Sequence, residues 1–180
     1  MTSDKLYVGL VLLVGLERLV ELVVSERNRR WSLARGGVET GARHYPAMVA
    51  LHVGLLVGCV VEVTVADRPF LPWLGWPMLA LLIASQVLRW WCIGTLGRQW
   101  CTRVIVVPGL PAVTGGPYRW LRHPNYLAVV VEGFALPLVH TAWVTALAFT
   151  VLNAILLLGF RIPAEERALR SVTTTTTTTK

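Results

Sequence analysis

Charge is scarce in this sequence. Of its 180 residues, 15% are Asp, Glu, Lys or Arg, whereas soluble domains carry about 25%. The chain is also 54% hydrophobic and contains eight tryptophans. This composition excludes an intrinsically disordered chain, a coiled coil and a collagen-like protein. Long apolar runs also replace the amphipathic stripes of a water-soluble enzyme, so the composition predicts a membrane protein.

Cysteine is scarce as well. Cys59, Cys92 and Cys101 are odd in number, and no two of them have CxxC spacing. We therefore predict reduced thiols and no metal site, instead of a disulfide framework or a zinc centre. The run from Thr173 to Lys180 is a near-homopolymer that cannot bury an apolar face, so we expect a single domain over residues 1–172 and a low-complexity tail over 173–180.

Five apolar segments predict an all-α bundle of about five transmembrane helices. The segments are Leu6–Val24, Ala47–Ala66, Leu71–Leu96, Tyr126–Val139 and Trp143–Phe160. The first three have the roughly 20 residues that a membrane-spanning helix needs. The fourth has 14 residues and reaches only about 21 Å of the ~30 Å hydrocarbon core. We expect the fourth and fifth segments to form a helical hairpin that turns at His140 and Thr141.

Basic residues collect in alternate loops, which predicts the orientation of the bundle. Only Lys5 and Arg68 lie on the other side. The positive-inside rule then places the N-terminus outside and the C-terminus in the cytoplasm, and we expect the membrane to be the cytoplasmic membrane of a bacterium. Positive charge spread over loops favours contact with anionic membrane lipid and argues against nucleic-acid binding. The basic residues on the predicted cytoplasmic side are Arg27, Arg29, Arg30, Arg35, Arg43, Arg98, Arg103, Arg119, Arg122, Arg161, Arg167, Arg170 and Lys180.

Several charged residues fall inside or beside the apolar segments, where burying a charge costs about 2.5–3.5 kcal/mol even on the gentlest scale. Glu17, Arg18 and Glu21 share neighbouring faces of the first segment, and we interpret them as an interfacial cluster. Glu62 is expected at the opposite interface. Arg89 stands beside two tryptophans, so we expect its side chain to snorkel toward the aromatic belt.

Glu132 has no basic neighbour in the sequence and lies near the middle of the fourth segment. Such a carboxylate must face a polar cavity, find a partner or be protonated. A second polar stretch, from Gly115 to Tyr126, gathers its side chains at the predicted start of a helix, a favourable place for an anionic group. A third follows the last segment, where Arg161 and Glu165 share a helical face.

Together these motifs resemble the isoprenylcysteine carboxyl methyltransferases, a family of integral-membrane enzymes. The resemblance covers about residues 95–170. It rests on Gly116-Pro117-Tyr118, on Arg122-His123-Pro124-Asn125-Tyr126, on a hydrophobic hairpin, and on Arg161 followed by Glu165-Glu166. Near the N-terminus, Ser25, Arg27-Asn28, Gly36-Gly37, Glu39 and His44-Tyr45-Pro46 resemble a narrower bacterial branch that methylates alkylpyrones or phenolic lipids.

The resemblance implies an O-methyltransferase that uses S-adenosyl-L-methionine and a lipophilic acceptor entering from the bilayer. It implies that Glu165 holds the ribose or the amino-acid end of the donor, and that Arg161 faces the reacting centre and the acceptor. His44 and Glu132 are further candidates for substrate binding, and Glu132 for catalysis. The residues implied to bind the donor are Tyr118, Arg122, His123, Pro124, Asn125, Tyr126 and Glu165.

The acceptor remains open between a phenol, a hydroxypyrone and a prenylcysteine-type carboxylate. A carboxylate needs no base, whereas a phenol with a pKa near 10 needs one, for which Glu132, His44 and His123 are the candidates. Three alternatives compete: a sterol-type NADPH-dependent reductase, which also carries an HPNY motif, an N-methyltransferase of phospholipid headgroups, and a non-enzymatic membrane scaffold or transporter.

Overall fold

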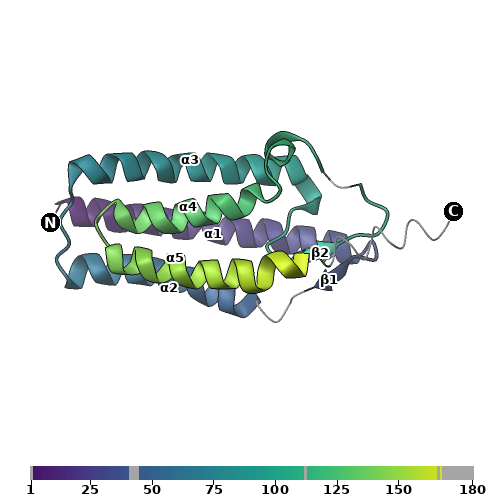
Figure 1. The fold of residues 1–180 in the computed structure, drawn as a ribbon, viewed down its shortest axis with the longest axis horizontal. Coiled ribbons are helices and arrows are strands. Elements are labelled where there is room, and N and C mark those ends of the chain that lie inside the picture. The colour runs from purple at the N-terminus through teal and green to yellow at the C-terminus, as the bar shows by residue number, and fades with distance from the viewer. Residues whose placement is uncertain (1, 41–44, 112, 166, 168–180) are drawn as a thin grey trace.

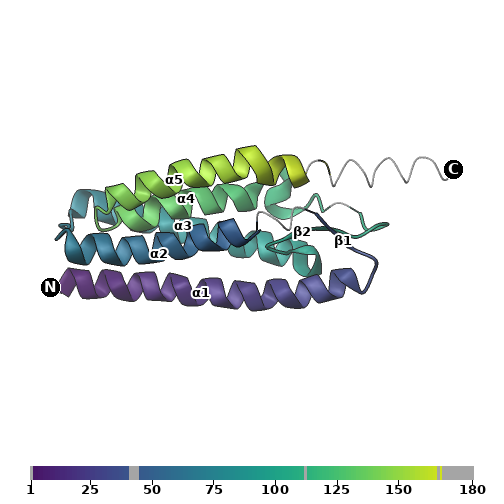
Figure 2. The same ribbon diagram turned by 90° about the horizontal axis from the view of Figure 1, so that it is seen from below.

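Five helices with nearly parallel axes form an elongated bundle (Figures 1 and 2). The structure is a computed structural model that describes residues 2–40, 45–111, 113–165 and 167. The helices are α1 (Thr2–Leu33), α2 (Tyr45–Val65), α3 (Pro72–Leu96), α4 (Pro124–Leu138) and α5 (Trp143–Leu156). α1 lies along one edge of the bundle in Figure 2, with α4 and α5 on the far side. The predicted all-α membrane bundle is confirmed.

Two short strands mark one end of the bundle, which we call the strand end. β1 (Val38–Thr40) follows α1, and β2 (Val104–Val106) follows α3; they pair antiparallel, with Glu39 opposite Ile105. β2 consists of three β-branched residues, which favour extended backbone. Arg103 Nη1 also donates to Glu39 at 2.7 Å. This small sheet ties the α1–α2 connection to the chain that leads toward α4.

Membrane-spanning character is clearest in three helical stretches of the described chain. Tyr45–Val65, Pro72–Gln99 and Trp143–Glu165 are long and apolar enough to cross a bilayer. Apolar side chains such as Leu6, Trp73 and Leu158 are largely exposed on the outside of the bundle. A water-soluble monomer rarely leaves such extensive apolar surface uncovered, so we expect lipid to cover the outside of the bundle.

α1 continues well past the first predicted segment, which ends at Val24. Glu26 begins a charged extension of the helix, where its carboxylate accepts hydrogen bonds from Arg29 at 2.7 Å and from Arg30 at 2.9 Å. These contacts, above all the one with Arg29, lower the pKa of Glu26 to about 2. Pairs at i, i+3 and i, i+4 stabilise a helix, which accounts for the extension to Leu33.

The end of the bundle opposite the strands is held by polar contacts. Glu62 of α2 accepts hydrogen bonds from the backbone N–H groups of Val144 and Thr145, at 3.2 and 2.8 Å, and pairs with Arg68. It thereby satisfies N–H groups in the first turn of α5 that have no partner within the helix. The α4–α5 hairpin turns at Thr141, as predicted, and the Thr141 hydroxyl donates to Pro69 O at 2.6 Å.

α4 and α5 pack closely because Gly133 leaves room for Phe149. A Cβ atom at Gly133 would lie 1.9 Å from Phe149 Cε1. We expect Gly133→Ala to lower the free energy of unfolding by about 1–3 kcal/mol, the usual cost of overpacking. Thermal unfolding in detergent, followed by circular dichroism, measures this change.

Gly54 of α2 is the matched control, because a Cβ atom there has no neighbour within 4 Å among the described residues. Gly54→Ala should raise stability slightly, since alanine is favoured over glycine in a helix by about 0.5–1 kcal/mol. Equal effects of the two substitutions would show that the contact between Gly133 and Phe149 is not tight.

Candidate active site

The chain preceding α4 is shaped to pass close to α3. Gly115 leads into a 3₁₀ turn, Gly116–Arg119, and α4 then begins at Pro124, in the first helical position. Gly116 has φ +55°, and a Cβ atom there would lie 2.4 Å from Thr95 Oγ1 of α3. Glycine is therefore required at this position both by its backbone conformation and by the space available.

Four side chains from the start of α4 and from the helical residues that follow α5 meet near the strand end. We call them the rim cluster: His123, Tyr126, Arg161 and Glu165. The Tyr126 hydroxyl donates a hydrogen bond to the Glu165 carboxylate, and Arg161 Nε donates to the same hydroxyl at 3.2 Å. The His123 ring stacks on Tyr126 with centroids 5.4 Å apart, and its Nδ1 lies 3.4 Å from Glu165 Oε1. Residues predicted from two separate motifs are thus brought together.

Arg161 is the most buried member of the rim cluster, with 7% of its surface exposed. Its guanidinium donates to the carbonyl oxygen of Thr102 and lies 3.6 Å from Met48 Sδ of α2. It therefore joins α5 both to the chain after α3 and to α2. Neither Thr102 nor Met48 was singled out in the sequence, where no motif distinguishes either residue.

α1 fixes the segment that carries Thr102. The Ser25 hydroxyl lies 2.7 Å from Thr102 Oγ1, and Asn28 Nδ2 donates to Trp100 O at 2.8 Å. Both Ser25 and Asn28 are buried. The N-terminal motif noted in the sequence therefore supports the rim cluster indirectly, by positioning the backbone that Arg161 binds.

A π-helical turn, Leu157–Arg161, separates α5 from its polar continuation. Such turns insert one extra residue into a helix and occur frequently at functional sites. Arg161 closes this turn, and the following helical residues lead to Glu165. The irregular turn thus sets the direction in which both side chains of the cluster point.

The loop residues predicted to bind a donor surround the rim cluster. Burial raises the pKa of Tyr118, whose hydroxyl contacts the Cys92 thiol of α3. Arg122 is exposed beside the start of α4. Asn125 Oδ1 is buried and accepts no hydrogen bond within the described part of the chain. A buried acceptor without a donor is costly, so a ligand that brings an N–H or O–H group would satisfy it.

A second polar group lies deeper in the bundle, and we call it the core ion network: Arg18 and Glu21 of α1, Arg89 of α3 and Glu132 of α4. Arg89 Nη2 donates to Glu132 Oε2 at 2.5 Å, and Arg18 Nη1 donates to Glu21 Oε2 at 2.7 Å. Cross-contacts join the two pairs, from Arg18 to Glu132 at 3.5 Å and from Arg89 to Glu21 at 3.6 Å.

The core ion network corrects two interpretations of the sequence. Arg89 was expected to snorkel, but only 4% of its surface is exposed and it points inward to Glu132. In the cluster of α1 that was expected at the interface, Glu21 is likewise buried inside the bundle. Two guanidinium groups and two carboxylates pair with one another inside the bundle, which replaces contact with the interface. Glu132, 2% exposed, finds its partners here.

His44, predicted to bind substrate, and Glu166 of the double-glutamate motif lie outside the described residues. Pro124 is buried at the start of α4, where it fixes the helix next to the rim cluster. All three cysteines are free, and Cys59 and Cys92 are buried.

Comparison with known proteins covers most of the chain. Residues 78–171 match the model of the isoprenylcysteine carboxyl methyltransferase (ICMT) family. The uncharacterized protein YpbQ of Bacillus subtilis (strain 168) is 35% identical over 162 residues, which cover 89% of this chain and 95% of YpbQ. An uncharacterized protein of Haemophilus influenzae (strain ATCC 51907 / DSM 11121 / KW20 / Rd) is 26% identical over 155 residues, covering 84% of this chain and 88% of that protein.

Proposed function

Because the chain belongs to the isoprenylcysteine carboxyl methyltransferase family, a family of membrane methyltransferases, we propose that it transfers a methyl group from S-adenosyl-L-methionine to an oxygen of a membrane-dissolved lipid. The observation that carries this proposal is the rim cluster. It joins His123 and Tyr126 of one family motif to Arg161 and Glu165 of the other, across the α4–α5 hairpin.

The residues around the rim cluster fit the polar groups of the donor. Glu165 and the unsatisfied Asn125 Oδ1 are acceptors suited to an ammonium group, ribose hydroxyls or an adenine amino group. The exposed Arg122, next to the start of α4, suits a carboxylate. Donors and acceptors are thus both present among these residues.

When bound, S-adenosyl-L-methionine supplies an electrophilic methyl group on a positively charged sulfur. His123, Tyr126 and Glu165 would hold this donor so that an acceptor oxygen could take the methyl group, while the electron pair of the carbon–sulfur bond would stay with sulfur. The chain contributes mainly alignment, since well-oriented reactants gain most from being held in line. Tyr126 is rigid because it is stacked on His123 and hydrogen-bonded on both sides.

A phenolic or pyrone hydroxyl also has to lose a proton, and we assign its removal to His123. This ring lies in the rim cluster, with Nδ1 facing the Glu165 carboxylate, an arrangement in which a carboxylate orients a base. Glu132 lies six residues further along α4 than Tyr126, which corresponds to about 9 Å. Glu132 is therefore the alternative base, and turnover of a variant without this carboxylate on a phenolic lipid distinguishes the two.

The acceptor that we propose is a polyketide-derived phenolic lipid or alkylpyrone, with a prenylcysteine-type carboxylate as the other acceptor class. The excess of arginine in the loops at the strand end supports an active site that faces the cytoplasm of a bacterial cell. The apolar exterior of the bundle supports lateral entry of the acceptor from the bilayer.

We expect the purified protein to bind S-adenosyl-L-methionine and to transfer its labelled methyl group to one lipid class. The experiment titrates the protein with the donor and, separately, with NADPH, and then offers prenylcysteines, alkylresorcinols, alkylpyrones and phosphatidylethanolamine. Label in only one lipid class identifies the acceptor. Binding of NADPH without binding of the methyl donor would contradict the proposal and favour a reductase, and binding of neither would leave a non-enzymatic protein.

A further inference from the structure

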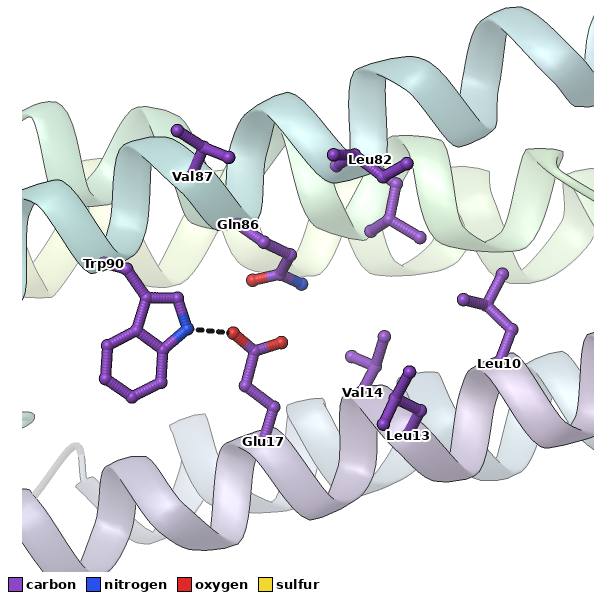
Figure 3. A pocket seen from close by; sticks show the side chains of 9 residues that line it. Leu10, Leu13, Val14, Glu17, Leu82, Gln86, Val87 and Trp90 are labelled. Carbon is purple, nitrogen blue, oxygen red and sulfur yellow. Dashed lines mark hydrogen bonds between the residues drawn. The ribbon is translucent and has the colours of Figure 1, made fainter.

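An apolar groove of about 400 Å³ lies between α1 and α3 (Figure 3). Its walls are aliphatic, with Leu13 and Val14 on α1 and Leu82 and Ile83 on α3. From Leu10 to Glu17 along α1 it extends over about 10 Å. An apolar groove of this size suits one hydrocarbon chain. The groove is open to the outside of the bundle, because Leu13 and Ile83 are largely exposed.

The groove ends on polar groups on the side nearer the strand end. There the Trp90 indole N–H donates to the Glu17 carboxylate and bridges the two helices (Figure 3). Gln86 Oε1 accepts from Arg18 at 2.9 Å, which fixes the amide with its nitrogen turned away from the arginine. Gln86 Nε2 is buried and has no hydrogen-bond partner among the described residues. Figure 3 shows this amide in the gap between α1 and α3.

The charge around this polar end does not favour an anionic ligand. Glu17 and the core ion network together provide three carboxylates and two guanidinium groups, so an added anion would meet no excess of positive charge. Glu17 also lies seven residues before Val24, the end of the predicted span, which places it about 10 Å inside. A charged headgroup at that depth would be costly, whereas an uncharged one is tolerated.

We propose that the groove between α1 and α3 binds the hydrocarbon chain of a single-chain amphiphile, whose uncharged head group accepts a hydrogen bond from Gln86 Nε2. On the proposed function, this amphiphile is the methyl acceptor. α3 runs between the groove and the loop that is predicted to bind the methyl donor. Cys92 lies six residues beyond Gln86, or about 9 Å along α3, and it contacts Tyr118 of that loop. α3 therefore leads from the polar end of the groove toward the loop that contains Tyr118.

Two neighbouring leucines of α1 provide a matched test. Leu13 lines the groove and is 63% exposed, whereas Leu12 is 66% exposed and does not line it. Leu13→Trp fills the groove from its open side, so it should raise the KM for a dodecyl-chain acceptor about tenfold, the effect of losing one to two buried methylene contacts. Leu12→Trp, and the Kd for the methyl donor in either variant, should stay unchanged. Equal KM values for the two variants would overturn the proposal.

A photoreactive probe locates the chain without relying on catalysis. The probe is 4-dodecylphenol with a diazirine at the end of its chain, irradiated with the full-length protein and mapped by mass spectrometry. Adducts within residues 10–14 or 82–87, displaced about tenfold better by 4-dodecylphenol than by dodecyl sulfate, support the groove and its uncharged head group. Adducts confined to other helices, or equal displacement by the charged amphiphile or by phosphatidylcholine, would contradict it.

The same probe separates this proposal from the proposed function. Labelled methyl product together with adducts outside the groove would overturn the groove and leave the methyltransferase activity standing. Adducts in the groove, without methyl transfer to any lipid offered, would support the groove as an amphiphile site and overturn the proposed reaction.

Discussion

We expect Glu165→Gln to weaken the binding of S-adenosyl-L-methionine about 10- to 100-fold, which isothermal titration of the protein in detergent would measure. Glutamine keeps an oxygen that accepts from Tyr126 but removes the negative charge that faces a cationic ligand group. A hydrogen bond to a charged group contributes about 1.5–3 kcal/mol, and each 1.4 kcal/mol corresponds to a factor of ten. The fold-change follows from losing one such contact.

Glu26→Gln is the control for this experiment. Glu26 also pairs with arginines near the strand end, but it lies on the exposed extension of α1 and contacts no member of the rim cluster among the described residues. Its substitution should leave donor affinity unchanged. An unaltered Kd in Glu165→Gln would remove Glu165 from the donor site, and with it the fit of the rim cluster to the donor.

Arg89→Met lowers the free energy of unfolding by about 3–5 kcal/mol, because it leaves a buried carboxylate without its main partner. Glu132 then keeps only Arg18, 3.5 Å away, which Glu21 also engages. Unfolding in detergent, followed by tryptophan fluorescence, measures the loss. Arg68→Met is the matched control: its pair with Glu62 is more exposed, and such pairs contribute about 0–1 kcal/mol.

The double variant Arg89→Met/Glu132→Met should recover most of this stability. It leaves Arg18 and Glu21 as a balanced pair, and replacing a buried ion pair by apolar side chains of similar size is often neutral. A double variant no more stable than Arg89→Met would contradict a direct pairing of the two residues. Its turnover on a phenolic lipid also tests Glu132, since retained turnover would remove Glu132 from the proton-transfer step.

Much of the fold could be predicted from the sequence, because a helix that crosses lipid needs a long run of apolar residues. The five segments, the short fourth helix and the turn at His140 and Thr141 all appear where hydropathy places them. The extension of α1 beyond Val24 was missed because its charges indicated a loop, although they pair with one another along a helix. β1 and β2 were missed because three-residue strands leave no periodic pattern.

The two halves of the rim cluster could be predicted, since each is a recognisable motif, but the inward direction of Arg89 could not. α3 is apolar on nearly every face, so its sequence does not distinguish the side that packs against α1 and α4. The partners of Arg89 lie on other helices, and only the packed bundle brings them within reach. Thr102 and Met48 were missed for the same reason, because they act through contacts between segments distant in sequence.

The π-helical turn at Leu157–Arg161 divides the last helix into two parts, and the side chains of the second part are rotated around the helix axis relative to those of the first. One extra residue in a turn rotates everything after it by about 100° around the helix axis. The lipid-facing side chains of α5 and the polar side chains of Arg161 and Glu165 therefore do not follow one continuous helical repeat. Substitutions that adapt α5 to a thicker or thinner bilayer can then leave the direction of the two polar side chains unchanged.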